Sequence, residues 1–332
     1  MTAGQTTDRL DGLGETPPGD SRCTDLNGPV RYLDFGGPAG GPVIVCVHGL
    51  GGSAVNWTAV APLLTGTCRV LAPDLAGHGL TQSLGRGTDV ASNRALLHRF
   101  VMSVTGGPVI LMGNSMGGMI SLLEASAAPA AVAGLVLVDP ALPFVPARPD
   151  PLVTAMFAAY LTPGLRRAVQ ARRRRQVPAE LVSSIMELCC ADPSRVAPEV
   201  IARHIEVAVQ RAAFPTIEAD FAAAMRSVVR TAGYPHGRAY SRRVRSVTCP
   251  VLLIHGTADR LVPIAAARAA ARANPAWSLR EFGGVGHVPQ LETPQDTADA
   301  VLGWLASAGQ QAAHAARAAR TAPVGANGDG MP

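Results

Sequence analysis

One stretch decides the fold of this chain: Val109-Ile110-Leu111-Met112-Gly113-Asn114-Ser115-Met116-Gly117-Gly118. Its four leading apolar residues predict a short buried strand, and the apolar residues that follow the stretch predict a buried helix. The Gly-x-Ser-x-Gly motif between them is typical of a nucleophile elbow, in which small neighbours let the strand and the helix cross closely. The hydroxyl of Ser115 is then expected at the carboxyl end of a sheet and the amino end of a helix, where developing negative charge is favoured.

The motif by itself is a weak signal. Many chains contain Gly-x-Ser-x-Gly by chance, and the same pattern suits a glycine-rich turn that carries a surface serine. The flanking strand and helix strengthen the interpretation as a nucleophile. Partner residues in the right order downstream are needed to decide between the two.

Strands and helices alternate on both sides of this motif. The strands are continuous apolar runs, as expected of interior strands in a parallel sheet. The alternation predicts an α/β fold with a mostly parallel central sheet covered by helices on both faces. The predicted strands span 30–35, 42–47, 69–72, 109–112, 134–138, 250–254 and 277–282, and the predicted helices span 56–64, 90–104, 264–273 and 294–306.

The alternation stops between residues 143 and 240. Apolar residues there recur with helical spacing, as at Ile201, Ile205 and Val209, and prolines divide the segment into short pieces. The sequence therefore predicts a helical insertion that forms a cap or lid. The expected organisation is a disordered leader over 1–27, a core made of 28–142 and 241–308, the cap over 143–240 and a flexible tail over 309–332.

The composition suits one large α/β domain with an insertion. The chain has 332 residues, of which 48% are hydrophobic and 16% charged, so it can bury a sizeable core. It contains no uninterrupted apolar run long enough to cross a membrane, and its polar start lacks the apolar core of a signal peptide, so a cytoplasmic protein is expected. The six cysteines show no Cys-x-x-Cys spacing and are interpreted as reduced thiols, not as disulfides or metal ligands.

The net charge of +5 is concentrated in the predicted cap, which holds 13 arginines and 8 acidic residues. The cluster Arg172-Arg173-Arg174-Arg175 accounts for much of this excess. A basic surface can attract nucleic acid or anionic lipid. Because no aromatic interleaving or nucleic-acid-binding pattern accompanies the cluster, it is interpreted as a solvated helix end, and no nucleic-acid partner is expected.

Taken together, these residues resemble the α/β-hydrolase superfamily, in its lidded branch. The resemblance covers residues 28–308 apart from the insertion. Its strongest support is the order of serine, acid and histidine, each at the end of a predicted strand. The motifs that carry it are His48-Gly49-Leu50-Gly51-Gly52, the turn from Asp74 to Gly79, the Ser115 elbow, Asp259 and Gly286-His287. The resemblance implies an α/β-hydrolase fold and a serine hydrolase that needs neither a cofactor nor a metal.

The resemblance and general chemistry assign a role to each candidate residue. A serine hydroxyl is a poor nucleophile without an adjacent base, and His287 is the candidate base for Ser115. A carboxylate must orient the imidazole and stabilise its cation. The commoner family pattern, His-Gly-x-x-Asp after the later strand, favours Asp259, with Asp139 as the alternative because it also ends a strand. Asp74 precedes the serine and is interpreted as shaping its own turn.

The oxyanion of the reaction needs two hydrogen-bond donors that are already in place. By resemblance these are the backbone N–H groups of Leu50 and Met116. His48 is expected to fix the loop that carries Leu50, and His78 and His255 are likewise interpreted as structural.

The substrate is less well defined by the sequence. The insertion holds seven of the 14 aromatic residues, which suggests a lid with an apolar underside, although the same residues also suit the lid's own core. We expect hydrolysis of a hydrophobic carboxylic ester. Three alternatives stay open: cleavage of a carbon–carbon bond, transfer of an acyl group or cleavage of a thioester, and a non-catalytic binder. Gly-Asn-Ser-Met-Gly-Gly resembles the elbow of carbon–carbon hydrolases, but Val288 follows His287 where that subgroup usually has tryptophan. The oligomeric state is not predicted.

Overall fold

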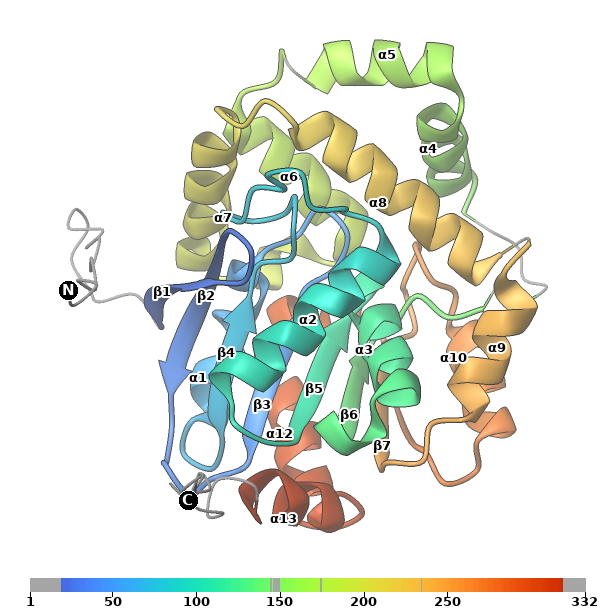
Figure 1. The fold of residues 1–332 in the computed structure, drawn as a ribbon. Coiled ribbons are helices and arrows are strands. Elements are labelled where there is room, and N and C mark those ends of the chain that lie inside the picture. Colours follow the sequence, from blue (N-terminus) through green and yellow to red (C-terminus); the bar gives the residue numbers. More distant parts are fainter. Residues whose placement is uncertain (1–18, 144, 146–149, 174, 234, 319–332) are drawn as a thin grey trace, which may run out of the picture.

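Eight strands form one sheet in the order β1-β2-β4-β3-β5-β6-β7-β8 (Figure 1). The structure is a computed structural model that describes residues 19–143, 145, 150–173, 175–233 and 235–318. The pairings β1–β2 and β2–β4 are antiparallel, and all others are parallel. The strands are β1 (Asp20–Asp25), β2 (Pro29–Gly36), β3 (Val43–Val47), β4 (Arg69–Pro73), β5 (Val109–Asn114), β6 (Val132–Val138), β7 (Val251–Gly256) and β8 (Ser278–Phe282). The mostly parallel sheet that the alternating pattern predicts is confirmed.

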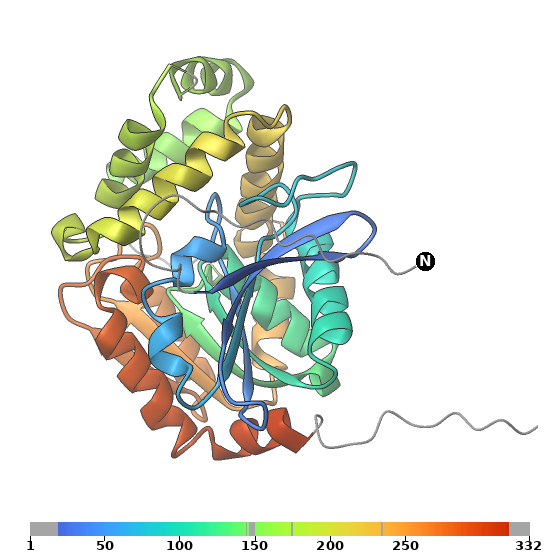
Figure 2. The same ribbon diagram turned by 90° about the vertical axis from the view of Figure 1, so that its left-hand side faces the viewer.

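Helices cover both faces of the sheet, and Figure 2 shows the sheet between the two layers. Alternate residues of β3 point to opposite faces: Val43, Val45 and Val47 belong to the core that includes residues of α2, α3 and α10, whereas Ile44 and Cys46 belong to the core that includes residues of α1, α12 and α13. This explains why the strands are apolar throughout, since each side of the pleat is buried. The helices outside the insertion are η1 (Ala54–Trp57), α1 (Ala61–Leu64), α2 (Val90–Val104), α3 (Met116–Ala127), η2 (Pro129–Ala131), α10 (Ile264–Ala273), α11 (Pro289–Glu292), α12 (Pro294–Leu305) and α13 (Gln310–Ala318).

The segment between β6 and β7 is helical in its described parts. Five helical elements in the described parts begin with a proline, because the missing N–H group costs nothing at the first position of a helix. These prolines therefore start elements as well as separating them. In Figure 1, α4 to α8 lie above the end of the sheet at which β5 stops, and α9 packs against α3. The elements are α4 (Pro151–Leu161), α5 (Pro163–Arg173), α6 (Pro178–Cys189), η3 (Pro193–Arg195), α7 (Pro198–Arg211), α8 (Ile217–Ala232) and α9 (Gly237–Arg245).

Two predictions about the ends of the chain are wrong within the described residues. Residues 20–25, expected in a disordered leader, form the edge strand β1 on β2. Their polar sequence gives no strand pattern, because backbone pairing alone holds a strand that is exposed on both faces. Residues 310–318, expected in a flexible tail, form α13, whose buried Ala312, Ala313 and Ala316 join the core beneath the sheet. The rest of both segments, 1–18 and 319–332, lies outside the described residues.

None of the helices in the described ranges combines the length and the apolar character needed to cross a bilayer. No disulfide joins the cysteines of the described ranges, and Cys46 and Cys68 are buried in the core.

Candidate active site

Ser115 lies at the turn from β5 into α3, in a conformation that residues other than glycine rarely adopt (φ 54°, ψ −117°). Its N–H group donates to the carbonyl oxygen of Val138 at 3.1 Å, and its own carbonyl oxygen accepts from the N–H of Ala141 at 2.9 Å. A β-carbon at Gly117 would lie 2.0 Å from the carbonyl oxygen of Val47, so only glycine lets α3 cross so close to β3. The strained strand-to-helix turn that the motif predicts is therefore present.

Asp259 and His287 lie against one another, although 28 positions separate them in the sequence. The Nδ1 atom of His287 is 2.7 Å from Oδ2 of Asp259, and both side chains are buried. The other carboxylate oxygen of Asp259 accepts the backbone N–H groups of Leu261 and Val262, at 2.7 and 3.0 Å. Burial by itself raises the pKa of Asp259, but His287, together with His255 and the N–H of Val262, holds the pKa below its ordinary value.

Asn114 joins the serine turn to the histidine loop. Its side-chain amide donates to the carbonyl oxygens of Val138 and His287, each at 3.0 Å. Within the described part of the chain, no hydrogen bond joins the imidazole of His287 to the hydroxyl of Ser115. What joins the serine turn to the histidine loop is therefore the side chain of Asn114.

The loop after β3 lies against the serine. A β-carbon at Gly49 would lie 3.1 Å from Cβ of Ser115. Leu50 follows in this loop, and Met116 is the first residue of α3, whose leading N–H groups have no partner within the helix. The two residues expected to supply the oxyanion donors thus flank Ser115 on different elements.

His48 and His78 hold this region together, as expected of structural histidines. Nδ1 of His48 donates to the carbonyl oxygen of Gly49 at 2.8 Å, and Nε2 accepts the N–H of Leu75 at 3.0 Å, so the ring must be neutral. Burial lowers the pKa of His48 to about 3 and the pKa of His78 to about 4. Both ring nitrogens of His48 are already hydrogen-bonded, so this ring is not available as a second base.

The two other candidate carboxylates have different partners. Asp74 accepts the N–H groups of Ala54 and Leu80, at 2.7 and 2.6 Å, and so shapes its own turn as predicted. Burial raises the pKa of Asp74 to about 6. Asp139 accepts the N–H of Gly256 at 2.9 Å, and the hydrogen bonds of its carboxyl group do not include His287. The geometry therefore favours Asp259 over Asp139 as the partner of the histidine.

Asp139, His255 and Asp259 place three potential metal-ligand atoms within 4.8 Å of one another. The oxygens of Asp259 already accept hydrogen bonds from Leu261, Val262 and His287. We therefore interpret the three residues as a hydrogen-bonded cluster and not as a metal site.

The helical insertion reaches the histidine loop through a residue that sequence reasoning missed. Glu292, on α11, is buried and accepts the N–H of Gly286 at 2.9 Å. It also accepts the N–H groups of Ala191 and Asp192, each at 3.1 Å, which belong to the insertion. The only sequence signal was an acidic residue five positions after His287, directly after Leu291. Asn114 was likewise missed as a connecting residue, because its partners lie on β6 and in the loop between β8 and α11.

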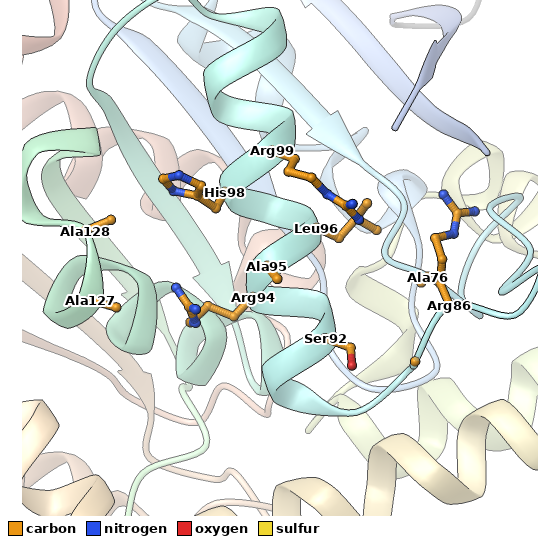
Figure 3. A pocket seen from close by; sticks show the side chains of 11 residues that line it. Ala76, Arg86, Ser92, Arg94, Ala95, Leu96, His98, Arg99, Ala127 and Ala128 are labelled. Carbon is orange, nitrogen blue, oxygen red and sulfur yellow. The ribbon is translucent and has the colours of Figure 1, made fainter. Parts of the chain in front are cut away.

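A surface hollow of about 620 Å³ lies along α2, away from Ser115 (Figure 3). In Figure 3, Arg94 and His98 lie on one side of the helix, and Arg86 and Arg99 lie on the other. Arg94 and His98 pair with the buried Glu124, at 2.8 and 2.6 Å. None of the candidate catalytic residues lines this hollow, so we do not assign it to the reaction.

Comparison with known proteins identifies the family. The model of the alpha/beta hydrolase family matches residues 44–300. A pimeloyl-[acyl-carrier protein] methyl ester esterase of Aromatoleum aromaticum is 29% identical over 77% of this chain and 95% of its own length. A dihydrolipoyllysine-residue acetyltransferase component of an acetoin cleaving system from Pseudomonas putida is 28% identical over 83% of this chain and 66% of its own length.

Among solved structures, a putative lipase from Acinetobacter baumannii has the same fold, with a TM-score of 0.71 and 20% identity over 91% of this chain and 99% of its own. The family match and this fold confirm the predicted α/β-hydrolase architecture and the prediction of a hydrolase-class enzyme. The chain belongs to the alpha/beta hydrolase family.

Proposed function

We propose that this protein hydrolyses a carboxylic ester of a hydrophobic small molecule through a covalent acyl-enzyme. The observation that carries the proposal is the 2.7 Å contact between Asp259 and His287, joined by Asn114 to the strained turn that presents Ser115. A nucleophile on an elbow, an imidazole and a buried carboxylate, in that chain order, are the parts that acyl transfer requires. The esterase named above, similar over most of both chains, supports the same class of substrate.

The first half of the proposed reaction forms the acyl-enzyme. The Oγ atom of Ser115 bonds to the ester carbonyl carbon while His287 accepts the proton of the hydroxyl group. Asp259 stabilises the imidazolium that forms. The backbone N–H groups of Leu50 and Met116 hold the oxyanion, each worth about 3 kcal/mol of transition-state stabilisation. The tetrahedral intermediate then expels the alcohol, which takes the proton from His287. In the second half, His287 activates water, which attacks the acyl carbonyl and releases the acid and the free Ser115 hydroxyl.

We propose that residues 143–240 form the cap over this site and bound the acyl pocket. A β-carbon at Gly51, in the loop that carries the proposed oxyanion donor Leu50, would lie 3.0 Å from the ring of Phe221 on α8. That ring lies 5.3 Å, centre to centre, from the ring of Tyr160 on α4. Aromatic groups over the scissile bond favour an apolar acyl or aryl group over a sugar or a phosphate.

Transfer of the acyl group to an acceptor other than water is the second candidate. The similarity to an acetyltransferase component supports it, and both reactions share the first half. The elbow sequence Gly-Asn-Ser-Met-Gly-Gly keeps cleavage of a carbon–carbon bond as a third candidate. A non-catalytic binder would not need the Asp259–His287 contact.

The test is turnover of p-nitrophenyl esters of increasing acyl length beside a ring-cleavage dienoate and a thioester. We expect prompt ester hydrolysis with a chain-length optimum, and labelling of Ser115 by a fluorophosphonate, located by mass spectrometry. Ser115→Ala is the control and should lose both signals. Dienoate turnover with only feeble ester cleavage would replace the ester proposal, and no label on Ser115 in folded protein would overturn the serine mechanism.

A further inference from the structure

A second carboxyl group lies directly behind the Asp259–His287 pair. Asp139 follows β6, His255 belongs to β7 and Asp259 follows β7, so the ends of two neighbouring strands bring them to one point. The side chains of Asp139, His255 and Asp259 are inaccessible to solvent, and one polar atom of each lies within 4.8 Å of the other two. Two carboxyl groups are therefore buried together, away from solvent, beside the proposed catalytic histidine.

The hydrogen bonds of this cluster leave one oxygen without a donor. Nε2 of His255 lies 2.9 Å from the carbonyl oxygen of Val262, which can only accept, so the ring proton is on Nε2 and is used there. Asp139 Oδ1 accepts the N–H of Gly256 at 2.9 Å. Among the described residues, Oδ2 of Asp139 has no hydrogen-bond donor.

A proton on the carboxyl group of Asp139 explains how its Oδ2 can be buried without a hydrogen-bond donor. A buried carboxylate oxygen without a donor is costly, and two adjacent buried carboxylates cannot both carry a charge. A protonated Asp139 becomes a donor, and the neighbouring carboxylate of Asp259, which has an oxygen within 4.8 Å of an Asp139 oxygen, can accept from it. Asp259 must be the charged partner, because it already accepts from Leu261, Val262 and His287, whereas Asp139 accepts only from Gly256.

The electrostatics of the cluster agree with this placement of the proton. Burial raises the pKa of Asp139 well above its ordinary value, and the charges of Asp259 and Glu292 raise it further. The groups that face the pair are His255, His287, Glu292 and the thiol of Cys189; burial lowers the pKa of His255 and raises the pKa of Cys189 to about 12, so both are neutral at pH 7. Asp139 also has a backbone φ of 44°, in the left-handed region, which indicates that the fold holds this side chain in place against a local cost.

We propose that Asp139 is a positioning residue whose neutral carboxyl group donates a hydrogen bond to the Asp259 carboxylate and fixes it against His287. The role of this bond in turnover rests on the proposed serine hydrolase function. The protonation of Asp139 does not rest on that function, because it follows from the two buried carboxyl groups alone.

The first test measures protonation without substrate. The infrared spectrum of the wild-type protein at pH 8 should contain a C=O band of a protonated carboxyl group. Asp74, the other buried acid with a raised pKa, titrates at about 6 and is ionised at that pH. Asp139→Asn should remove the band, and Asp299→Asn, at an exposed carboxylate of α12, should leave it. Absence of the band from folded wild-type protein would overturn the proposal.

The second test measures positioning. In Asp139→Asn the amide oxygen can still accept from Gly256 and the amide N–H can replace the proton donated to Asp259. We expect kcat/KM within about threefold of wild type and an unchanged acid limb of its pH profile. Asp139→Ala leaves Asp259 without this donor, and kcat should fall about 10- to 100-fold with little change in KM.

The alternative outcome has a distinct signature. If Asp139 is ionised in the wild-type protein, Asp139→Asn removes a negative charge near His287, and the acid limb moves to lower pH. Loss of the proposed function is separable from loss of this inference: a protein without esterase activity would still show the carboxyl band if Asp139 is protonated.

Discussion

The backbone N–H of His287 donates a 2.6 Å hydrogen bond to the carbonyl oxygen of Cys189, the last residue of α6. The histidine loop is therefore attached to the helical insertion as well as to the sheet. Glu292 strengthens this attachment, because its carboxylate accepts N–H groups from Gly286 on one side and from Ala191 and Asp192 on the other. Displacement of this part of the insertion would displace the proposed base.

The first prediction concerns Glu292. Glu292→Gln replaces one accepting oxygen with an amide that faces backbone N–H groups, so the free energy of unfolding should fall by about 2–4 kcal/mol. Because the His287 loop loses its anchor, kcat should fall more than KM rises. Urea unfolding and steady-state kinetics measure the two effects. Glu180→Gln, at an exposed position of α6, is the matched control, and a Glu292→Gln protein as stable as that control would contradict the anchoring role.

The second prediction concerns the strain at Ser115. Its φ of 54° suits glycine, so Ser115→Gly should be more stable than Ser115→Ala by about 1 kcal/mol, although glycine is the more flexible residue in the unfolded chain. Both variants should lose ester turnover. Denaturant unfolding of the two proteins, measured side by side, checks the difference. Greater stability of the alanine variant would show that the turn is not strained by its φ angle.

The third prediction concerns Asp259. Asp259→Asn keeps the shape of the side chain but removes the charge that opposes the His287 cation, so kcat should fall about 10³- to 10⁴-fold. Asp139→Asn should stay close to the wild-type rate. Steady-state kinetics of the two variants, with circular dichroism to establish folding, make the comparison. The reverse ranking would assign the role of the acid to Asp139.

The fourth prediction concerns stability at acid pH. His78 is neutral in the folded protein down to a pKa of about 4 but takes up a proton near 6.5 when unfolded, so its contribution to stability is present above pH 6.5 and is lost as the pH falls from 6.5 to 4. Between pH 6.5 and 4, the unfolding free energy of His78→Phe should therefore fall less steeply than that of wild type, by about 1.4 kcal/mol per pH unit.

The slope of the unfolding free energy against pH must be compared between variants, because Asp74 changes the stability in the opposite direction. Its pKa is raised to about 6, so its contribution favours the folded state below pH 3.8 and is lost as the pH rises to 6. Unfolding free energies of wild type, His78→Phe and the control His236→Gln, at an exposed imidazole, should be measured every half unit from pH 4 to 7. Equal slopes for all three proteins would show that His78 is not held neutral by burial.

The local sequence determined most of the elements. The helices predicted over 90–104 and 264–273 correspond to α2 and α10, because each has a regular apolar face and a clear end signal. The apolar runs correspond to strands β3 to β7, since a parallel strand buried on both faces must be apolar throughout. β1 and α13 were missed, because one depends on backbone pairing with β2 and the other on alanines small enough to lie beneath β6.

The candidate residues Ser115, Asp259 and His287 were also available from the sequence, because each follows a strand and their order matches that of the family. For the acid, the sequence favoured Asp259 over Asp139 only through the family pattern, since both follow strands and chain order cannot say which carboxylate meets the imidazole. The tertiary structure adds a 2.7 Å contact between Asp259 and His287, whereas Asp139 has a backbone partner. The link between Glu292 and the insertion likewise exists only in three dimensions: a hydrogen bond between distant segments depends on where the sheet and helices place the chain, and no short stretch of sequence contains that information.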